Sequence, residues 1–217
     1  VRDRPGPESL GLAFRRQGDE HAATTELEAA LATFERLGAR LDASRAKEAL
    51  GKVQARRTFL FTDIVDSSRL LATLGDDKWK KLLARHDQLV RERVAESGGE
   101  VIKQTGDGFF ASFENPRAAI EAALAIQRSL DAEIFAPDVR IGAHTGDAFQ
   151  TGAGGNDYGG QGVHTAARIG EAAGPCEILV SRETLDGAGS AFRLSEPRTA
   201  VLKGFEQPIE LVAVDWR

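Results

Sequence analysis

Methionine is absent from this 217-residue sequence, and cysteine occurs once, as Cys176. A single cysteine cannot form an internal disulfide, which favours a reducing compartment such as the cytoplasm. No apolar run approaches the length that a membrane-spanning helix needs, and no signal-peptide pattern opens the chain. Because the chain starts at Val1 and has no methionine, we expect either a fragment of a longer polypeptide or an alternative start codon.

Two common phosphate-binding motifs are also missing. The sequence has no GxxxxGKS or GxxxxGKT loop and no GxGxxG after a strand-like run, so any phosphate binding must use another device. The net charge of −5 argues against a general nucleic-acid binder but is compatible with a nucleotide ligand. The hydrophobic and charged fractions, 41% and 28%, are typical of a globular protein.

Residues 1–52 show helical periodicity without strand signals. One apolar stripe at i, i+3, i+4 and i+7 consists of Leu27, Ala30, Leu31 and Phe34. The spacing of a tetratricopeptide repeat is matched by Leu10, Gly11, Phe14, Gly18, Ala23, Leu27 and Ala30, so the segment resembles one such repeat. A single repeat must end an array or pack on a partner, for example an upstream sensor or repeat domain. A plain helical hairpin explains the pattern equally well; either would be a coupling or interaction element.

From Arg57 onward strands alternate with helices, which indicates a second domain over residues 58–217. Strands are predicted at 58–65, in a hairpin over 100–113, at 139–149, at 177–181, and near 200–205 and 209–216. Helices are predicted at 68–96 with a break at Gly75, at 116–135 and at 162–173. This order, with a hairpin in its middle, predicts an α+β sheet covered by helices and not a doubly wound nucleotide-binding fold.

Two aspartates stand out in these strands. Asp63 falls on the same face of the first strand as Phe59 and Phe61, where burying an unpaired carboxylate is costly. Asp107 lies in the Gly-Asp-Gly turn of the hairpin and, taken alone, is a turn residue. If the hairpin pairs beside the first strand, the two carboxylates converge and repel unless they share a proton or a cation. Two such oxygen ligands, completed by water and phosphate, describe a Mg²⁺ or Mn²⁺ site for displacement at phosphorus.

Four stretches carry a family resemblance. They are FTDIVDSS (61–68), EVIKQTGDGFFASF (100–113), VRIGAHTGD (139–147) and NDYGGQGVHTAARI (156–169). Together and in this order they resemble the catalytic domain of the class III adenylate and guanylate cyclases, from about Thr58 to Val214. The resemblance implies a ferredoxin-like βαββαβ core that dimerises, with ATP or GTP bound in a cleft between two catalytic domains.

The resemblance also implies roles for individual residues. Asp63 and Asp107 match the two aspartates that bind two Mg²⁺ or Mn²⁺ ions, and the backbone carbonyl of Ile64 also faces the metal. Lys103 and Asp157 match the residues that read the purine. Lysine only donates hydrogen bonds and aspartate only accepts them, which suits the N1 acceptor and N6 donor of adenine. Guanine presents the reverse pair, so ATP is favoured.

Three further positions bear on catalysis. Arg168 matches the arginine that stabilises the charged α-phosphate in the transition state. His164 stands where many members carry an asparagine that orients the ribose; imidazole can also donate a hydrogen bond, but its shape differs. Asp66 stands where many relatives have glycine, and an acidic side chain beside phosphate is unfavourable unless it points away.

The leading hypothesis is a cytoplasmic adenylate cyclase that converts ATP to 3′,5′-cyclic AMP and pyrophosphate in a homodimer with shared active sites. The metal-binding aspartates and the purine-reading residues would come from different protomers. Two alternatives remain open. One is a regulatory nucleotide-binding or dimerisation module with little turnover, which His164 and Asp66 favour. The other is a guanylate cyclase, against which Lys103 and Asp157 argue.

Overall fold

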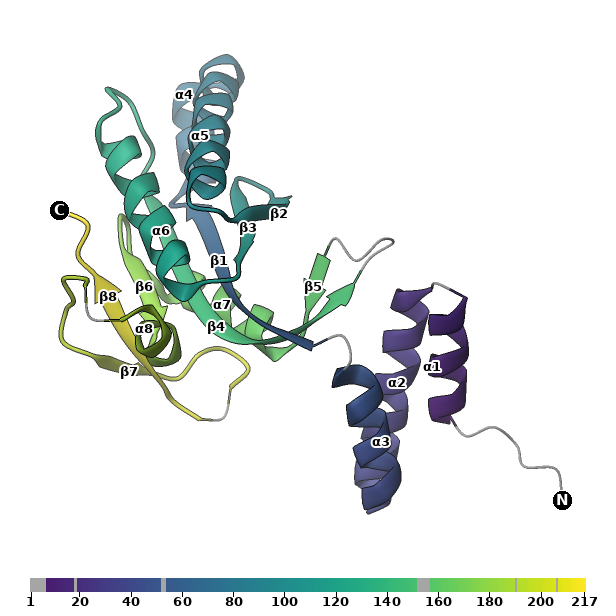
Figure 1. Ribbon diagram of the computed structural model, residues 1–217. Coiled ribbons are helices and arrows are strands. Elements are labelled where there is room, and N and C mark those ends of the chain that lie inside the picture. Colours follow the sequence, from purple (N-terminus) through teal and green to yellow (C-terminus); the bar gives the residue numbers. More distant parts are fainter. Residues whose placement is uncertain (1–6, 18, 52–53, 152–156, 190, 206) are drawn as a thin grey trace, which may run out of the picture. The chain divides into compact units, whose positions relative to one another are not determined.

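The chain separates into two compact units, seen in the computed structural model of Figure 1. The first unit comprises Val1–Ala55 and Asp147–Gly160, and the second comprises Arg56–Gly146 and Gln161–Arg217. The structure describes residues 7–17, 19–51, 54–151, 157–189, 191–205 and 207–217.

The first unit contains three N-terminal helices, α1 (Pro7–Arg16), α2 (Glu20–Arg36) and α3 (Arg40–Gly51). Asp19 caps α2 by accepting a hydrogen bond from the backbone of Ala22 at 3.0 Å. Helices α1 and α2 approach closely at Gly11, where a Cβ would lie 2.6 Å from the side chain of Leu27. The predicted helical segment is therefore present. Its likeness to a tetratricopeptide repeat stays a prediction, and Gly18 of that motif lies outside the described residues.

The elements after α3 alternate as the sequence predicts. The strands are β1 (Gln54–Ile64), β2 (Glu100–Thr105), β3 (Gly108–Phe113), β4 (Val139–Thr151), β5 (Asp157–Gly159), β6 (Ile178–Ser181), β7 (Arg198–Ala200) and β8 (Ile209–Val214). The helices are α4 (Ser67–Leu74), α5 (Asp76–Glu96), α6 (Pro116–Asp131), α7 (Gln161–Ala172) and α8 (Arg182–Ala188). In the first unit, β5 pairs antiparallel with the end of β4.

The sheet runs in the order β2-β3-β1-β4-β6-β8-β7. Its first four strands have the order of the ferredoxin-like βαββαβ core, and β3 is antiparallel to both β1 and β2. Strand β6 is parallel to β4, and β8 returns antiparallel beside β6. The α+β fold class predicted from the sequence is therefore confirmed.

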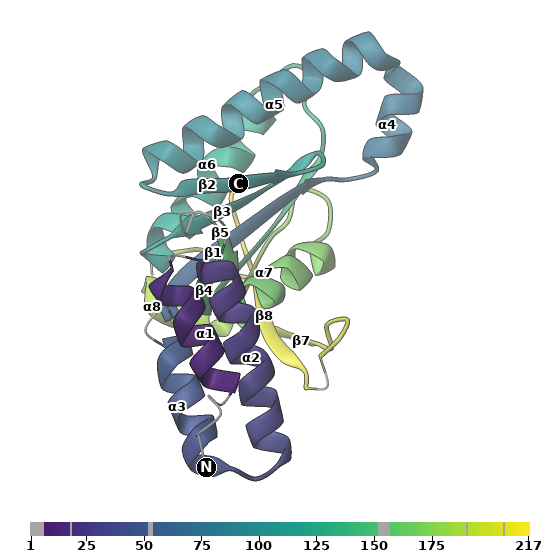
Figure 2. The same ribbon diagram turned by 90° about the vertical axis from the view of Figure 1, so that its right-hand side faces the viewer.

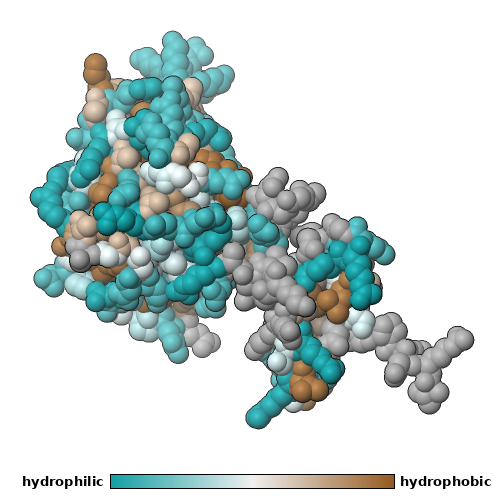
Figure 3. Space-filling view, viewed as in Figure 1, coloured by the Kyte–Doolittle hydropathy of each residue, from teal (hydrophilic) through white to brown (hydrophobic). Residues whose placement is uncertain are grey.

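Helices cover both faces of this sheet. Figure 2 shows α5 and α6 over one face and α7 over the other. The first face holds the main core, in which Phe109 and Phe113 of β3 pack with Ile120 of α6 and Val90 of α5. A smaller cluster around Ile169 packs on the second face. The surface visible in Figure 3 is mostly hydrophilic, and none of the described helices is long and apolar enough to cross a bilayer.

The predicted element boundaries differ from the structure in a few places. The predicted break at Gly75 separates α4 from α5, with a φ of 75°. Helix α6 ends at Asp131, although the periodicity predicted a helix as far as Phe135. The strand expected near 200–205 corresponds to β7, which ends at Ala200, and Leu202 beyond it is buried outside any strand. The short elements β5 and α8 carry too little periodicity to be predicted.

Candidate active site at the end of strand β1

Asp63 lies near the carboxyl end of β1, on the face that the alternation predicts. The rings of Phe59 and Phe61 both contact Phe110 of β3, with centroid distances of 5.8 and 4.6 Å. The next residue with the same parity is Asp63, which is half-buried. On the opposite face of β1, Leu60 packs in the main core between the sheet and helices α5 and α6.

The β2–β3 turn lies directly beside Asp63. Strand β3 pairs with β1 so that Thr62 is opposite Phe109, and the backbone of Phe109 also donates to the Thr62 hydroxyl at 3.0 Å. A Cβ on Gly108 would lie 2.0 Å from the carbonyl oxygen of Thr62 and 3.2 Å from the Cα of Asp63. Only glycine permits this approach. The pairing predicted from the sequence is confirmed, and it places Asp107 next to the end of β1.

The carboxylate of Asp107 has an unusual environment. Its Oδ2 atom is buried and has no hydrogen-bond partner among the described residues. Its charge acts on the ring of His86 from α5, and this effect opposes the burial that lowers the pKa of His86. A buried carboxylate oxygen without a donor is rare in folded proteins and calls for an explanation. A cation that binds there supplies one.

Arg140 of β4 holds the other carboxylate, which the sequence reasoning missed. Its Nε and Nη2 atoms donate to Oδ2 of Asp63 at 2.8 and 2.5 Å, and its Nη1 donates to the backbone carbonyl of Glu171 at 3.3 Å. The signal was present, because Arg140 is the one charged residue in the apolar run VRIGA. A cavity of about 290 Å³ opens here, lined among others by Asp63, Thr105, Arg140 and Glu171.

The residues at this end of β1 fit a divalent cation. Asp63 already attracts a positive group, and Asp107 presents a buried oxygen without a donor. Carboxylates are the hard oxygen ligands that Mg²⁺ and Mn²⁺ prefer. No group of three or more His, Cys, Asp or Glu side chains converges among the residues that the structure describes. Water and phosphate would therefore complete the coordination. The role of the Ile64 carbonyl stays a prediction; Ile64 itself is buried at the end of β1.

Helix α7 carries two of the predicted residues. His164 and Arg168 are four residues apart, so they share one face of the helix. His164 is exposed, whereas Arg168 binds both carboxylate oxygens of Glu171 at 2.6 Å. The helix lies very close to β4, since a Cβ on Gly142 would be 2.1 Å from the backbone nitrogen of Gly170.

The two predicted purine-reading residues belong to different units. Lys103 lies on β2, is exposed, and has its Nζ 5.7 Å from the ring centroid of Phe110. Asp157 begins β5 in the first unit, and its Oδ1 accepts a hydrogen bond from the backbone of Tyr158 at 2.8 Å. Their joint action on one purine therefore stays a prediction.

Asp66 has a left-handed backbone, with φ of 53° and ψ of 34°, just before α4. Glycine adopts this conformation most readily, and aspartate is among the few other residues that tolerate it. Its side chain is exposed and makes no capping hydrogen bond to α4. The backbone conformation explains why glycine suits this position.

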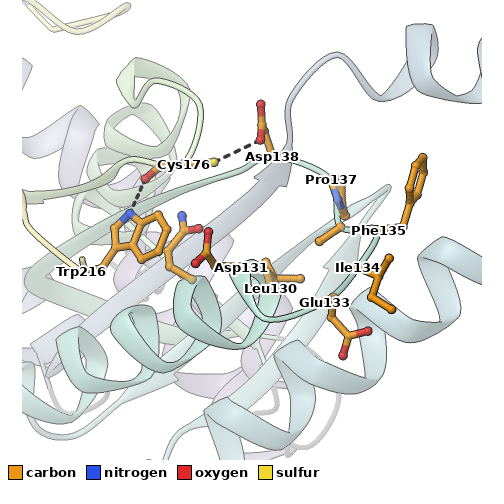
Figure 4. Close-up of a pocket in the computed structure, with 11 residues that line it drawn as sticks. Leu130, Asp131, Glu133, Ile134, Phe135, Pro137, Asp138, Cys176 and Trp216 are labelled. Atoms are coloured by element: carbon orange, nitrogen blue, oxygen red, sulfur yellow. Dashed lines mark hydrogen bonds between the residues drawn. The ribbon is translucent and has the colours of Figure 1, made fainter.

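A second hollow, of about 250 Å³, lies behind the end of α6 (Figure 4). There the thiol of Cys176 donates to Asp138 at 3.2 Å, and the indole nitrogen of Trp216 donates to the Cys176 carbonyl at 2.7 Å. Burial and the Asp138 carboxylate raise the pKa of Cys176 to about 11. This shift favours the protonated thiol at neutral pH, which is typical of a structural cysteine.

The comparisons with known proteins agree with this architecture. The sequence pattern of the adenylate and guanylate cyclase catalytic domain matches residues 52–213, and the chain therefore belongs to this family. A protein of Mycobacterium tuberculosis that carries the name "uncharacterized" is 30% identical over 187 residues, which are 79% of this chain and 33% of that protein. The chain thus spans about a third of the length of this curated relative.

Two solved structures share the fold. The adenylyl cyclase CyaB from P. aeruginosa superposes with a TM-score of 0.65 at 22% identity, over 75% of this chain and 95% of that one. The guanylate cyclase domain of RhGC from Catenaria anguillulae, solved with GTP, has a TM-score of 0.68 at 17% identity, over 75% and 97%. Cyclases of both nucleotides are therefore similar to this chain, and the likeness establishes the fold but not the purine.

Proposed function

We propose that this chain is an adenylate cyclase that forms 3′,5′-cyclic AMP and pyrophosphate from ATP. The observation that carries the proposal is the pairing of β3 with β1, which brings the turn with Asp107 beside the end of the strand with Asp63. Asp63 is paired with Arg140, and Asp107 has a buried oxygen without a donor among the described residues. The family to which the chain belongs contains enzymes of this reaction type, so a nucleotide triphosphate is the natural substrate class.

Different residues of the chain would bind the metal ions, stabilise the transition state and orient the ribose. Asp63, Asp107 and the Ile64 carbonyl would hold Mg²⁺ or Mn²⁺ ions, two for each site. When bound, these ions supply activation of the ribose 3′-hydroxyl and neutralisation of the phosphates. Arg168 stabilises the charge that develops on the α-phosphate, for which a rigid guanidinium is well suited. His164, one turn earlier on α7, orients the ribose by hydrogen bonding.

Lys103 and Asp157 would select adenine. The lysine ammonium can donate to N1, and the Asp157 carboxylate can accept from the N6 amino group. Guanine would place its N1–H donor next to the lysine donor and its O6 acceptor next to the aspartate acceptor, so neither hydrogen bond could form. A guanylate cyclase remains the competing hypothesis for this site, and faster turnover of GTP than of ATP by the chain would establish it.

The active unit would be a homodimer that shares its sites. The cleft beside Asp63 is lined by Ala167 and Glu171, whereas Arg168 does not line it and binds Glu171. A second protomer would supply an arginine and a lysine to this cleft. We place the enzyme in the cytoplasm, where ATP and Mg²⁺ are available, and propose that the N-terminal helices connect it to an upstream sensor.

The test is cyclic AMP formation from ATP and Mn²⁺ at increasing protein concentration, with Asp107→Ala beside the wild type. Specific activity should rise with concentration as dimers form, and the substitution should lower it by about 100-fold or more, as expected when a group that stabilises the transition state is lost. Asp131→Ala, at the exposed end of α6, is the control and should retain activity.

Arg140 and Glu171 favour a second candidate function, a regulatory nucleotide-binding module with little turnover. Arg140 forms an ion pair with Asp63, and Glu171 forms one with Arg168. In the single chain, both proposed catalytic side chains are therefore already paired. If dimeric protein binds ATP but forms no cyclic AMP, this second function replaces the first.

A further inference from the structure

A chain of hydrogen bonds connects helix α5 to the turn that carries Asp107. His86 Nδ1 lies 3.2 Å from Oδ1 of Asp87, and Asp87 Oδ2 accepts from the side-chain amide of Gln104 at 2.9 Å. The same amide nitrogen donates to the backbone carbonyl of Gly106 at 3.3 Å. Because both acceptors are oxygens, the orientation of the Gln104 amide is fixed. The chain therefore ends one residue before Asp107.

The carboxylate of Asp107 has no comparable support of its own. Its buried Oδ2 has no hydrogen-bond partner among the described side chains and backbone groups. The position of this carboxylate thus depends on the backbone of the turn. That backbone is fixed on one side by β1, where Gly108 meets Thr62, and on the other side by Gln104.

His86 anchors the chain of hydrogen bonds in the core. Its side chain is fully buried, and its ring lies 5.9 Å from the ring of Phe109, two residues after Asp107. Since a carboxylate can only accept, the His86 Nδ1 atom carries the proton that is donated to Asp87. This donation fixes the tautomer of His86 and holds Asp87 toward Gln104, as outer hydrogen bonds do around metal ligands.

We propose that His86, Asp87 and Gln104 are positioning residues for Asp107, which set the place of its carboxylate and so the affinity of the chain for Mg²⁺ or Mn²⁺. The proposal rests on the proposed function for the identity of Asp107 as a metal ligand. None of the three residues touches substrate in this account; they act through the turn.

The experiment measures Mn²⁺ binding without nucleotide, from the loss of the free Mn²⁺ electron paramagnetic resonance signal. Gln104→Leu removes the last bond of the chain at an exposed position, and Asp87→Ala removes the middle of it. Gln88→Leu is the matched control: the amide of Gln88 makes an equivalent bond of 2.8 Å to Glu92 on the outer side of α5. Thermal unfolding verifies that each variant is folded.

Gln104→Leu and Asp87→Ala should weaken Mn²⁺ binding by roughly 10-fold, whereas Gln88→Leu should leave it unchanged. In the cyclase assay, the Mn²⁺ concentration for half-maximal rate should rise by a similar factor while the rate at saturating Mn²⁺ stays near the wild-type value. If the residues only stabilised the fold, the rate at saturating Mn²⁺ would fall as well.

The outcomes separate the two proposals. If Gln104→Leu binds Mn²⁺ as Gln88→Leu does, the positioning role is wrong even when the chain makes cyclic AMP. If no cyclic AMP forms but Mn²⁺ binding still depends on both Asp107 and Gln104, the positioning role stands and the cyclase proposal fails. If Asp107→Ala binds Mn²⁺ as the wild type does, both proposals fail.

Discussion

The two central carboxylates differ in how the protein compensates their charge. Asp63 receives two hydrogen bonds from Arg140, whereas Asp107 keeps a buried oxygen without any donor among the described residues. A buried carboxylate oxygen without a donor is destabilising, and a bound cation would compensate for the missing donor. This difference supports the proposed cation site, in which Arg140 contacts Asp63.

Arg168 gives the sharpest prediction about a single residue. Arg168→Ala should lower kcat by about 100-fold with a much smaller change in KM, because the α-phosphate gains its extra charge only in the transition state. Arg182→Ala is the matched control, since Arg182 is also a helical arginine with a carboxylate partner, Asp186. Steady-state kinetics with ATP and Mn²⁺ measures both. An equal loss in the two variants would remove Arg168 from the catalytic role.

His144 gives a prediction about pH. Burial lowers its pKa, the charge of Glu183 opposes this shift, and the charge of Arg56 adds to it. The unfolded chain therefore takes up this proton more readily, so the stabilisation is complete above about pH 6.5 and is lost as the pH falls through and below that value. The neutral ring is held by Ser181 at 2.8 Å.

The measurement for His144 is urea unfolding at about pH 8, 6.5 and 5 for wild type and His144→Gln. The free energy of unfolding of the wild type should fall toward acid pH, and the variant should lose less of it. His86, whose pKa burial also lowers, contributes to the slope that remains. An identical slope in both proteins would contradict the assignment to His144.

Among the secondary-structure elements, the contact between β4 and α7 is decisive for the site. Gly142→Ala would place a methyl group 2.1 Å from the Gly170 backbone, so the helix that carries His164 and Arg168 must move. We expect a loss of about 1–3 kcal/mol in the free energy of unfolding, and a lower kcat in the folded fraction. Gly174→Ala is the control, with its nearest contact at 3.5 Å. Similar denaturant midpoints for the two variants would contradict the close packing.

The elements were predicted well where the pattern is long and regular. The alternation in β1 and the Gly-Asp-Gly turn predicted the face of Asp63 and the hairpin of β2 and β3, because strand register follows from the hydrophobic face and the turn. The convergence of the carboxylates of Asp63 and Asp107 stays a prediction. Arg140 was missed because strand order is a long-range property: β4 lies beside β1 although about eighty residues separate Arg140 from Asp63. The hydrogen-bond chain from His86 to Gly106 depends on side-chain geometry that no spacing rule encodes.

At the scale of the whole molecule, each protomer carries both halves of the proposed site. Asp63 lies near the end of β1 and Asp107 in the β2–β3 turn beside it, while Arg168 is bound to Glu171 and does not line the cavity next to Asp63. A symmetric dimer would bring the arginine of one protomer to the aspartates of the other, so that two equivalent sites form from two chains. The proposed cyclase therefore depends most on this sharing of residues between protomers.

The most direct test mixes two inactive variants, Asp107→Ala and Arg168→Ala, in equal amounts after each has been shown to be folded and to form dimers. A mixed dimer has one site with both substitutions and one intact site, so random exchange should restore about a quarter of the wild-type cyclic AMP formation. If the mixture stays as inactive as its components while subunit exchange is demonstrated, the active site does not combine these residues from different protomers, and the shared-site cyclase is wrong.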